Sequence, residues 1–145
     1  MSSDHQKNHP FSVVIPVRIT DVNYGKHMAH TALIGILHQA RVLFLTAHNL
    51  DELNIEGSGL ILSNATYSYK TEAFFNTKLH IKVEIGEYSG ARFNFLYDVT
   101  NFDTGKRIVI GKEEMAFFDY GKKKSVKIPE TFLRICDACQ THIMC

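Results

Sequence analysis

Two hydrophobic patterns divide the chain into a helical part and a sheet part. Over residues 31–48, "TALIGILHQARVLFLTAH", apolar residues lie on almost every side of a helix, which predicts one long, buried helix. Beyond residue 59 apolar and polar residues alternate, as in "TKLHIKVEIGEY" at 77–88, which predicts antiparallel strands with one covered face. The expected strands are 11–20, 60–70, 77–88, 91–101 and 106–120, and a short amphipathic helix is expected over 129–145.

The order of these elements predicts an α+β fold. One strand, one long helix and four long strands are most economically folded as an antiparallel sheet that curls around the helix. Pro16 places the first strand at an edge or a bulge of the sheet, because proline cannot donate a ladder hydrogen bond. A single helix covers only part of such a sheet, so we expect a second copy to pair with it. Residues 11–145 are expected to form one domain after a flexible N-terminus at 1–10.

Composition argues against several classes of function. With 16 Lys and Arg against 15 Asp and Glu, the chain lacks the charge excess typical of nucleic-acid binding. Its first ten residues lack the apolar core of a signal peptide, and no apolar run is long enough to predict a membrane span. The three cysteines lie in the last ten residues and predict no disulfide framework, so a cytoplasmic location is expected.

The cysteines and one histidine recur at every third position of the tail. These residues are Cys136, Cys139, His142 and Cys145. Thiolates and imidazole are zinc ligands, but one helix rarely surrounds a metal tetrahedrally. We therefore expect no metal site, and instead expect the cysteines to pack on the inner face of the terminal helix.

The polar segment 21–30, "DVNYGKHMAH", directly precedes the predicted helix. It contains two histidines, an asparagine, an aspartate and a glycine, whereas the helix behind it is largely apolar. A polar loop fixed by a buried helix suits a binding or catalytic site, because the rigid element positions the loop. The loop is therefore the first candidate site in the sequence.

Three segments resemble hotdog-fold proteins of the 4-hydroxybenzoyl-CoA thioesterase-like superfamily. "RITDVNYGKHMAHTALIGILHQARVLFL" is similar to the family's loop and central helix, and "GLILSNATYSYKTEAFFNTKL" to a strand that ends in an aromatic-Lys-x-(Glu or Pro)-Ala stretch. "DTGKRIVIGKEEMAFFDYGKKKSVKIPETF" is similar to its last strand, and together the resemblance covers residues 11 to about 132. It implies a hotdog fold, a homodimer or homotetramer, and a site between two subunits at the start of the central helix.

The family hydrolyses acyl thioesters, usually of coenzyme A, so the resemblance implies an acyl-CoA thioesterase that uses no cofactor. It places the catalytic candidates in the loop and the helix: Asp21, Asn23, His27, His30 and Gln39. It places the substrate-binding candidates in the same loop, at the helix start and after the second strand: Tyr24, Gly25, Thr31, Tyr69, Lys70 and Glu72.

The family's active-site carboxylates are missing from their usual positions. One branch has Asp at the position of Asn23, and another has Glu at or near Gln39, while a fallback carboxylate position is Thr31 here. Amides cannot take a proton from water at neutral pH. His30 is the best-placed substitute, since a neutral histidine can act as a general base near pH 7. The alternative for His30 is a local hydrogen bond at the helix start.

Several assignments remain open from the sequence. Asp21 is expected to support the loop, and Asn23 either serves catalysis or caps the loop. Glu72 is a turn residue or a replacement carboxylate. His38 and Thr31 fall on nearly the same helical face with Arg41 close by, and are expected to form a polar stripe against a partner helix. Two functions therefore remain: hydrolysis of an acyl-CoA, or binding of an acyl thioester without turnover.

Overall fold

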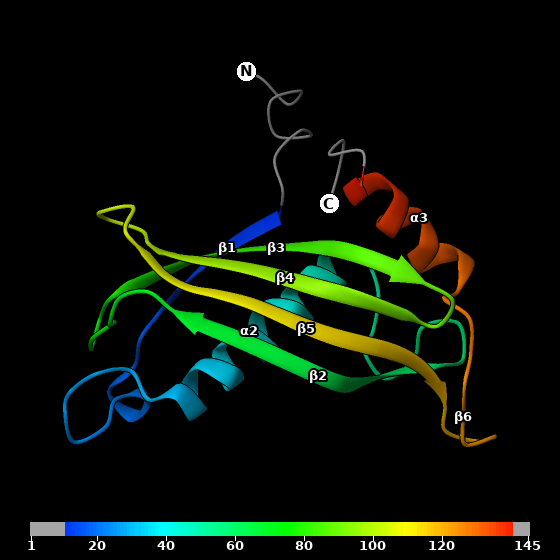
Figure 1. Cartoon of the computed structure of the whole chain (residues 1–145), viewed down its shortest axis with the longest axis horizontal. Helices are drawn as coiled ribbons and strands as arrows, with labels where there is room; N and C mark the ends of the chain where they lie inside the picture. The colour runs from blue at the N-terminus through cyan, green and yellow to red at the C-terminus, as the bar shows by residue number, and fades with distance from the viewer. Residues whose placement is uncertain (1–10, 141–145) are drawn as a thin grey trace.

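The structure is a computed structural model and describes residues 11–140. A six-stranded antiparallel sheet and two α-helices make up the fold (Figure 1). The elements are β1 (Phe11–Pro16), the 3-10 helix η1 (Ile19–Asp21), α2 (His30–Ala47), β2 (Gly59–Tyr69), β3 (Lys78–Ser89), β4 (Arg92–Asn101), β5 (Arg107–Asp119), β6 (Lys124–Ser125) and α3 (Glu130–Gln140). The predicted N-terminal segment 1–10 lies outside the described residues.

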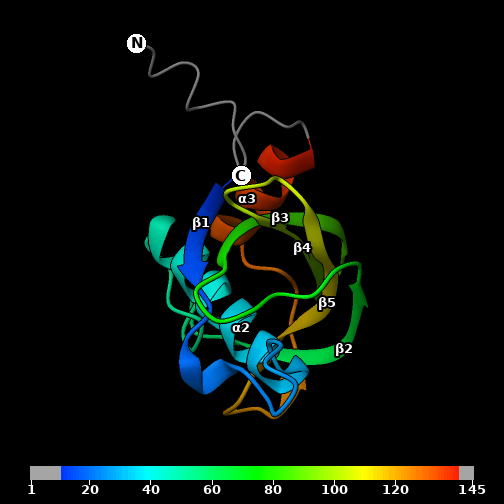
Figure 2. The ribbon, with the colours of Figure 1, turned by 90° about the vertical axis from the view of Figure 1, so that its left-hand side faces the viewer.

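The sheet has the strand order β1-β3-β4-β5-β2, and the short β6 pairs with β5. All of these pairings are antiparallel. Seen from the end, the sheet curls around α2, which lies along its inner face (Figure 2). This arrangement confirms the predicted α+β architecture and is consistent with a hotdog fold.

The predicted alternation of the long strands is confirmed by burial. The inward residues of β3 and β4 are at most 2% exposed: Leu79, Ile81, Val83, Ile85, Phe93, Phe95, Tyr97 and Val99. Phe44 of α2 meets Phe95 edge to face, with ring centroids 5.8 Å apart. The core is therefore the interface between α2 and the concave face of the sheet.

The first strand is shorter than predicted. β1 ends at Pro16, which is its last paired residue opposite Lys78, and the chain then turns into η1 instead of continuing to residue 20. The turn is held by Asp21, whose carboxylate accepts the backbone N–H of Arg18 at 2.8 Å. Of the two expectations for Pro16, an edge strand or a bulge, the edge strand is confirmed, because within residues 11–140 β1 pairs only with β3.

α2 is less completely buried than its composition predicts. Leu33 and Leu37 are fully buried against the sheet, but Ile34, Val42 and Leu43 are 36–43% exposed. The reason is geometric: a sheet that curls around one side of a helix leaves the opposite side open. The expectation of burial on nearly every side is therefore wrong for the chain alone.

α3 closes one end of the core. Phe132 lies 4.6 Å from Phe93 and 5.1 Å from Phe117, measured between ring centroids. Cys136 and Cys139 are buried, which confirms the expected inner-face packing for these two positions. Burial, followed by the charge of the neighbouring aspartate, raises the pKa of Cys136 to about 12.

The described residues carry neither a metal-binding cluster nor a membrane-spanning helix. Within 11–140, no group of three or more His, Cys, Asp or Glu side chains is arranged to hold a metal ion. No helix in this range is both long and apolar enough to cross a bilayer. The positions 142 and 145 of the tail pattern lie outside the described range.

Candidate functional site

A cavity of about 400 Å³ lies at the N-terminus of α2. Its walls come from the loop before α2, the first residue of α2, the end of β2 and the turn after it. The lining residues are Asn23, His27, Met28, His30, Tyr69, Lys70, Thr71 and Glu72. The structure thus brings together six candidates that the sequence analysis names, from two segments that lie some forty residues apart.

The loop before α2 is closed by its own hydrogen bonds. Asn23 and His27 share a backbone bond of 2.9 Å, and the Asn23 side-chain oxygen accepts the N–H groups of Gly25 and His27 at 3.0 and 3.4 Å. Lys26 has a φ of 66°, a left-handed conformation that favours glycine. The Asn23 amide therefore caps the loop and presents at most its N–H₂ group to the cavity.

The loop is also tied to the turn after β2. His27 and Phe74 form an antiparallel bridge, and the Met28 N–H donates to the Ala73 carbonyl at 2.7 Å. Across this pairing His27 Nδ1 lies 2.7 Å from Glu72 Oε1, and its ring meets Phe74 edge to face at 5.5 Å. The backbone of both segments thus fixes a histidine–carboxylate pair at the cavity.

The start of α2 has no side-chain cap. Its N-cap residue is Ala29, whose methyl group cannot accept a hydrogen bond, and the Ala29 carbonyl accepts the N–H groups of Ala32 and Leu33. Within the described residues, the N–H groups of His30 and Thr31 have no acceptor. These two donors sit at the positive end of the helix dipole, next to a cavity that His30 itself lines.

Two predicted catalytic residues line a different cavity. Asp21 and Gln39 belong to a space of about 400 Å³ between β1 and α2, which also includes Arg18 and Gly35. Asp21 is buried and accepts hydrogen bonds from Arg18 Nε and Nη2 at 3.1 and 3.0 Å. The Arg18 hydrogen bonds lower the pKa of Asp21 below its ordinary value, against the opposing effect of burial. One chain alone therefore does not unite Asp21 and Gln39 with Asn23 and His30.

Three predicted substrate-binding residues do not line the first cavity. The Tyr24 side chain is fully exposed, and Thr31 is exposed without lining either cavity described above. Gly25 leaves space beside His27, because a Cβ at this position would lie 3.4 Å from the His27 Nε2 atom. The loop conformation thus presents Gly25 to the histidine and Tyr24 to solvent.

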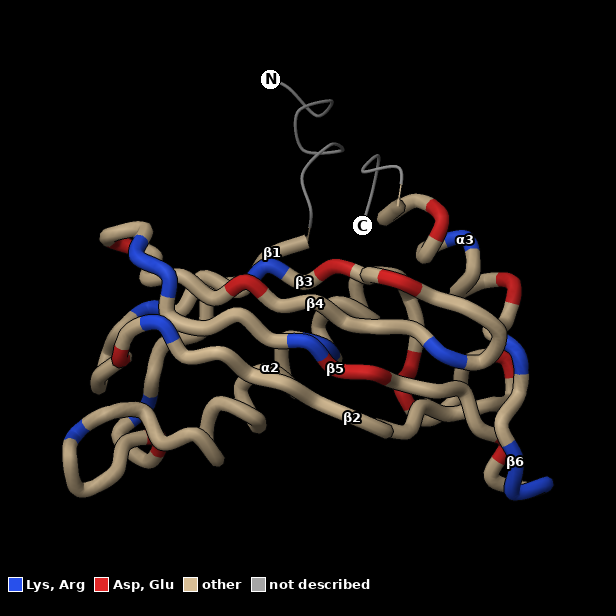
Figure 3. The backbone as a smooth tube through the Cα atoms, in the orientation of Figure 1, with Lys and Arg blue, Asp and Glu red and all other residues tan. Residues whose placement is uncertain are grey.

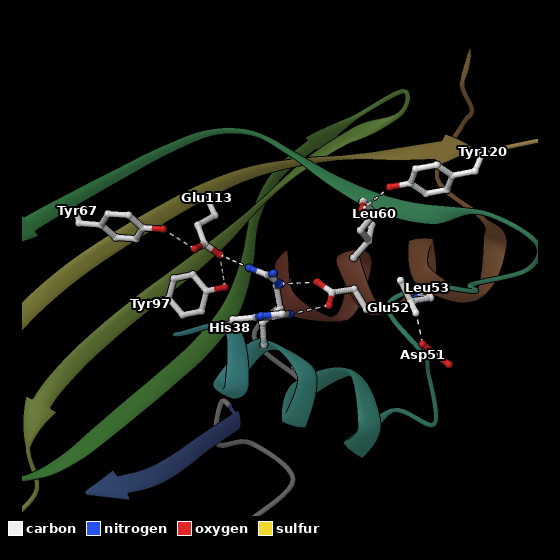
Figure 4. A network of polar contacts seen from close by, with 10 residues as sticks. His38, Asp51, Glu52, Leu53, Leu60, Tyr67, Tyr97, Glu113 and Tyr120 are labelled. Atoms are coloured by element: carbon white, nitrogen blue, oxygen red, sulfur yellow. Dashed lines mark hydrogen bonds and ion pairs between the residues drawn. The ribbon is translucent and has the colours of Figure 1, made fainter. Parts of the chain in front are cut away.

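A buried polar network that the sequence analysis missed crosses the core (Figure 4). The centre of the network is Glu113 on β5, which is 1% exposed. It accepts hydrogen bonds from Arg41 Nη1 at 2.8 Å, Tyr97 Oη at 2.5 Å and Tyr67 Oη at 2.6 Å. Arg41 also donates to Glu52 at 2.8 Å, and His38 pairs with the same carboxylate at 3.0 Å. The expected polar stripe is therefore wrong for Arg41, which points into its own sheet.

Burial and charge shift the ionisation of this network. Burial, followed by the charge of Glu113, raises the pKa of Tyr97 well above its ordinary value. Burial alone would lower the pKa of Arg41, but Tyr97, Glu113 and Glu52 raise it overall. The signal for this network was present in the sequence. Glu113 falls at an inward position of β5, where the alternation calls for an apolar residue.

The sequence matches the family model described as the thioesterase-like superfamily over residues 17–135. The chain belongs to this family. A search of curated protein sequences gave no match.

Solved structures of two CoA thioesterases and of one CoA-bound protein have the same fold. A 1,4-dihydroxy-2-naphthoyl-CoA thioesterase from Synechocystis has 16% identity and a TM-score of 0.82, covering 91% of this chain and 98% of its own. The SAV2348 protein from Staphylococcus aureus, solved in complex with CoA, has 17% identity and a TM-score of 0.83 over 92% and 85% of the two chains. A DHNA-CoA thioesterase from Staphylococcus aureus has 16% identity and a TM-score of 0.79 over 90% and 93%.

Proposed function

We propose that the protein hydrolyses an acyl-CoA thioester by water attack in the cavity at the N-terminus of α2. The observation that carries this proposal is the meeting of two histidines with an uncapped helix start in one cavity. Histidine can accept the proton of an attacking water near neutral pH. Membership of a thioesterase-like family supports the same reaction class.

The uncapped helix start suits the oxyanion of the reaction. When water attacks a thioester, the carbonyl oxygen gains a negative charge that hydrogen-bond donors can stabilise. The N–H groups of His30 and Thr31 are such donors, and the helix dipole favours an anion at the same place. A capping side chain at position 29 could occupy the N–H of Thr31, so alanine there leaves this donor for the substrate.

Lysines near the cavity suit the phosphates of CoA. Lys70 lines the cavity, and its backbone N–H pairs with β5 at Ile108, beside Lys106. Several Lys and Arg positions gather on the segments at this end of the sheet (Figure 3). The related SAV2348 protein was solved with CoA bound, which supports CoA as the carrier group here.

The active unit in this proposal is a pair of chains. One side of α2 exposes Ile34, Val42 and Leu43, and the outer edge of β2 has no strand partner within the described residues. Two copies that meet along this surface would cover the apolar side chains and place the Gln39 cavity of one chain near the His30 cavity of the other. Light scattering should give a dimer or tetramer, and a particle of one chain's mass would contradict this part.

Binding without turnover is a second candidate function, and one observation favours it. The positions 23, 31 and 39 carry no carboxylate, and the Asn23 oxygen is already used to cap the loop. In that case the cavity would hold an acyl thioester without a base to activate water.

A thiol-release assay separates the two functions. The wild-type protein should release free CoA from at least one member of a panel of aliphatic and aromatic acyl-CoAs, at a rate well above that of buffer. If no acyl-CoA is hydrolysed, but one of them raises the melting temperature through binding to the folded state, the protein is a binder.

A further inference from the structure

We propose that His27 is the general base of this reaction and that Glu72 is its positioning residue, so that this pair replaces the carboxylates missing at positions 23, 31 and 39. The inference rests on the proposed hydrolysis. It differs from the sequence-based hypothesis, in which His30 is the base. The difference comes from contacts that only the folded chain supplies.

The two cavity histidines differ in the partners of their rings. His27 Nδ1 lies 2.7 Å from Glu72 Oε1, an ion-pair distance, whereas no carboxylate of the described residues pairs with the His30 ring. A carboxylate at Nδ1 holds the proton on that atom, leaves the lone pair on Nε2, and stabilises the imidazolium that forms when Nε2 accepts a proton. His27 therefore has the orientation that a base requires.

The backbone also holds the His27–Glu72 pair rigid. His27 is paired through its backbone with Phe74, and Met28 bonds to Ala73, so Glu72 is held opposite the histidine by a short antiparallel ladder. The Asn23 side chain caps the loop from the other side through the N–H of His27. Catalytic side chains need such support, because small displacements of a reacting group cost rate.

The Nε2 atom of His27 is accessible. Gly25 lies beside this atom, and a Cβ there would be 3.4 Å from it, so glycine keeps the approach open. The His27 side chain is 39% exposed, and it lines the same cavity as His30. Water can therefore reach Nε2 from the cavity.

Other carboxylates near the loop or the core are already engaged. Asp21 is bonded to Arg18 and lines the second cavity, and Glu113 is buried between Arg41 and two tyrosines. Among the described residues that line the first cavity, Glu72 is the only carboxylate.

The reaction then balances as a simple hydrolysis. His27 Nε2 takes a proton from water while the water oxygen bonds to the thioester carbonyl carbon. The resulting oxyanion collapses, the carbon–sulfur bond breaks, and the imidazolium returns its proton to the departing thiolate. The products are a carboxylic acid and free CoA, and no other reactant is consumed. His30 contributes its backbone N–H to the oxyanion and its ring to substrate binding.

The test is a comparison of variants in the thiol-release assay. His27→Gln should lower kcat by roughly 10²-fold or more, the range for loss of a general base. His30→Gln should lower kcat much less, and its main effect should be a higher KM. Added imidazole should restore part of the activity of His27→Ala and none of that of His30→Ala.

The positioning role of Glu72 is tested by a measurement that a purely structural role would not affect. Glu72→Ala should lower kcat by roughly 10-fold or more, Glu72→Asp should recover part of it, and His27→Gln/Glu72→Ala should be no slower than His27→Gln alone. Glu87→Ala removes an exposed carboxylate on β3 outside this cavity and is the matched control. Circular dichroism should show that all variants are folded.

The outcomes separate this inference from the function on which it rests. Wild-type protein that hydrolyses none of the acyl-CoAs overturns the proposed function. An active wild type whose turnover survives His27→Gln but not His30→Gln overturns the base assignment alone. Independent, multiplicative effects of the His27 and Glu72 substitutions would overturn their coupling.

Discussion

The two carboxylates that matter most in this molecule lie in opposite environments. Glu113 is 1% exposed, and it accepts hydrogen bonds from an arginine and two tyrosines. The Glu72 side chain is 59% exposed, and its one partner among residues 11–140 is His27, which lines the same cavity. A buried carboxylate whose hydrogen-bonding capacity is fully used can stabilise the fold but cannot bind a substrate. A histidine–carboxylate pair at a cavity still has a ring nitrogen that can bind one. The comparison predicts that one site controls stability and the other controls turnover.

The largest expected effect is on stability. Glu113→Ala leaves Arg41 with Glu52 as its remaining carboxylate partner and removes the acceptor of two tyrosines, so it should cost about 3 kcal/mol in the free energy of unfolding. Glu72→Ala should change this free energy by no more than about 0.5 kcal/mol, because the side chain is exposed. Denaturant unfolding at one fixed protein concentration measures both, and equal losses would remove the distinction between the two sites.

A substitution at the loop cap should raise turnover. In Asn23→Asp, a carboxylate oxygen can still accept the N–H groups of Gly25 and His27, so the loop should keep its shape. The change also restores the family's carboxylate at the cavity, and kcat should rise by roughly 10-fold, less than the range for a sole base. Steady-state kinetics against the wild type is the measurement. A fall in kcat with unchanged folding would show that the amide itself is needed.

Substitutions at the strained loop position 26 should have a smaller effect, on the free energy of unfolding. Lys26 has a φ of 66°, which strains a branched side chain most and glycine least. Lys26→Val should destabilise the protein by about 1–2 kcal/mol, whereas Lys26→Gly should stay within about 1 kcal/mol of the wild type. Thermal unfolding compares them. Equal melting temperatures for the two variants would mean that the loop adopts another conformation in solution.

The smallest expected effect is on the stability of the protein at acidic pH. Because Arg18 lowers the pKa of Asp21, this pair stabilises the fold fully above the ordinary aspartate pKa of about 3.9. Its contribution is lost as the pH falls through the lower, folded-state pKa. Asp21→Asn should therefore lose at most about 1 kcal/mol at pH 7, since Arg18 is exposed, and should flatten the stability profile below about pH 4. Unfolding curves between pH 2 and 7 would show an unchanged slope if the pair contributes nothing.

The sequence predicts the fold because periodicity reports burial directly. The alternation of apolar and polar residues in β3 and β4 predicts which of their side chains point inward. The apolar segment after the polar loop predicts both ends of α2 to within one residue. β1 is predicted too long, because the Arg18–Asp21 contact that turns the chain is not a hydrophobic pattern. The open side of α2 escapes prediction for another reason: an apolar composition cannot say which neighbour covers each side.

The site is predicted only in part. Sequence motifs point to the loop and to the segment 69–72, but they cannot show that His27 and Glu72 face each other, because this contact depends on a backbone pairing between distant segments. They also group Asp21 and Gln39 with His30, although one chain places them in separate cavities. The Glu113 network is missed because its partners come from α2, β2, β4 and β5 and from the segment after α2.

The most direct test of the proposed function is thiol release by the wild type beside a variant that lacks both cavity histidines, His27→Gln/His30→Gln. The wild type should hydrolyse at least one acyl-CoA, and the double variant, still folded and of the same oligomeric state, should fall to the rate of buffer. A double variant as active as the wild type would show that hydrolysis occurs away from this cavity, against the proposed function.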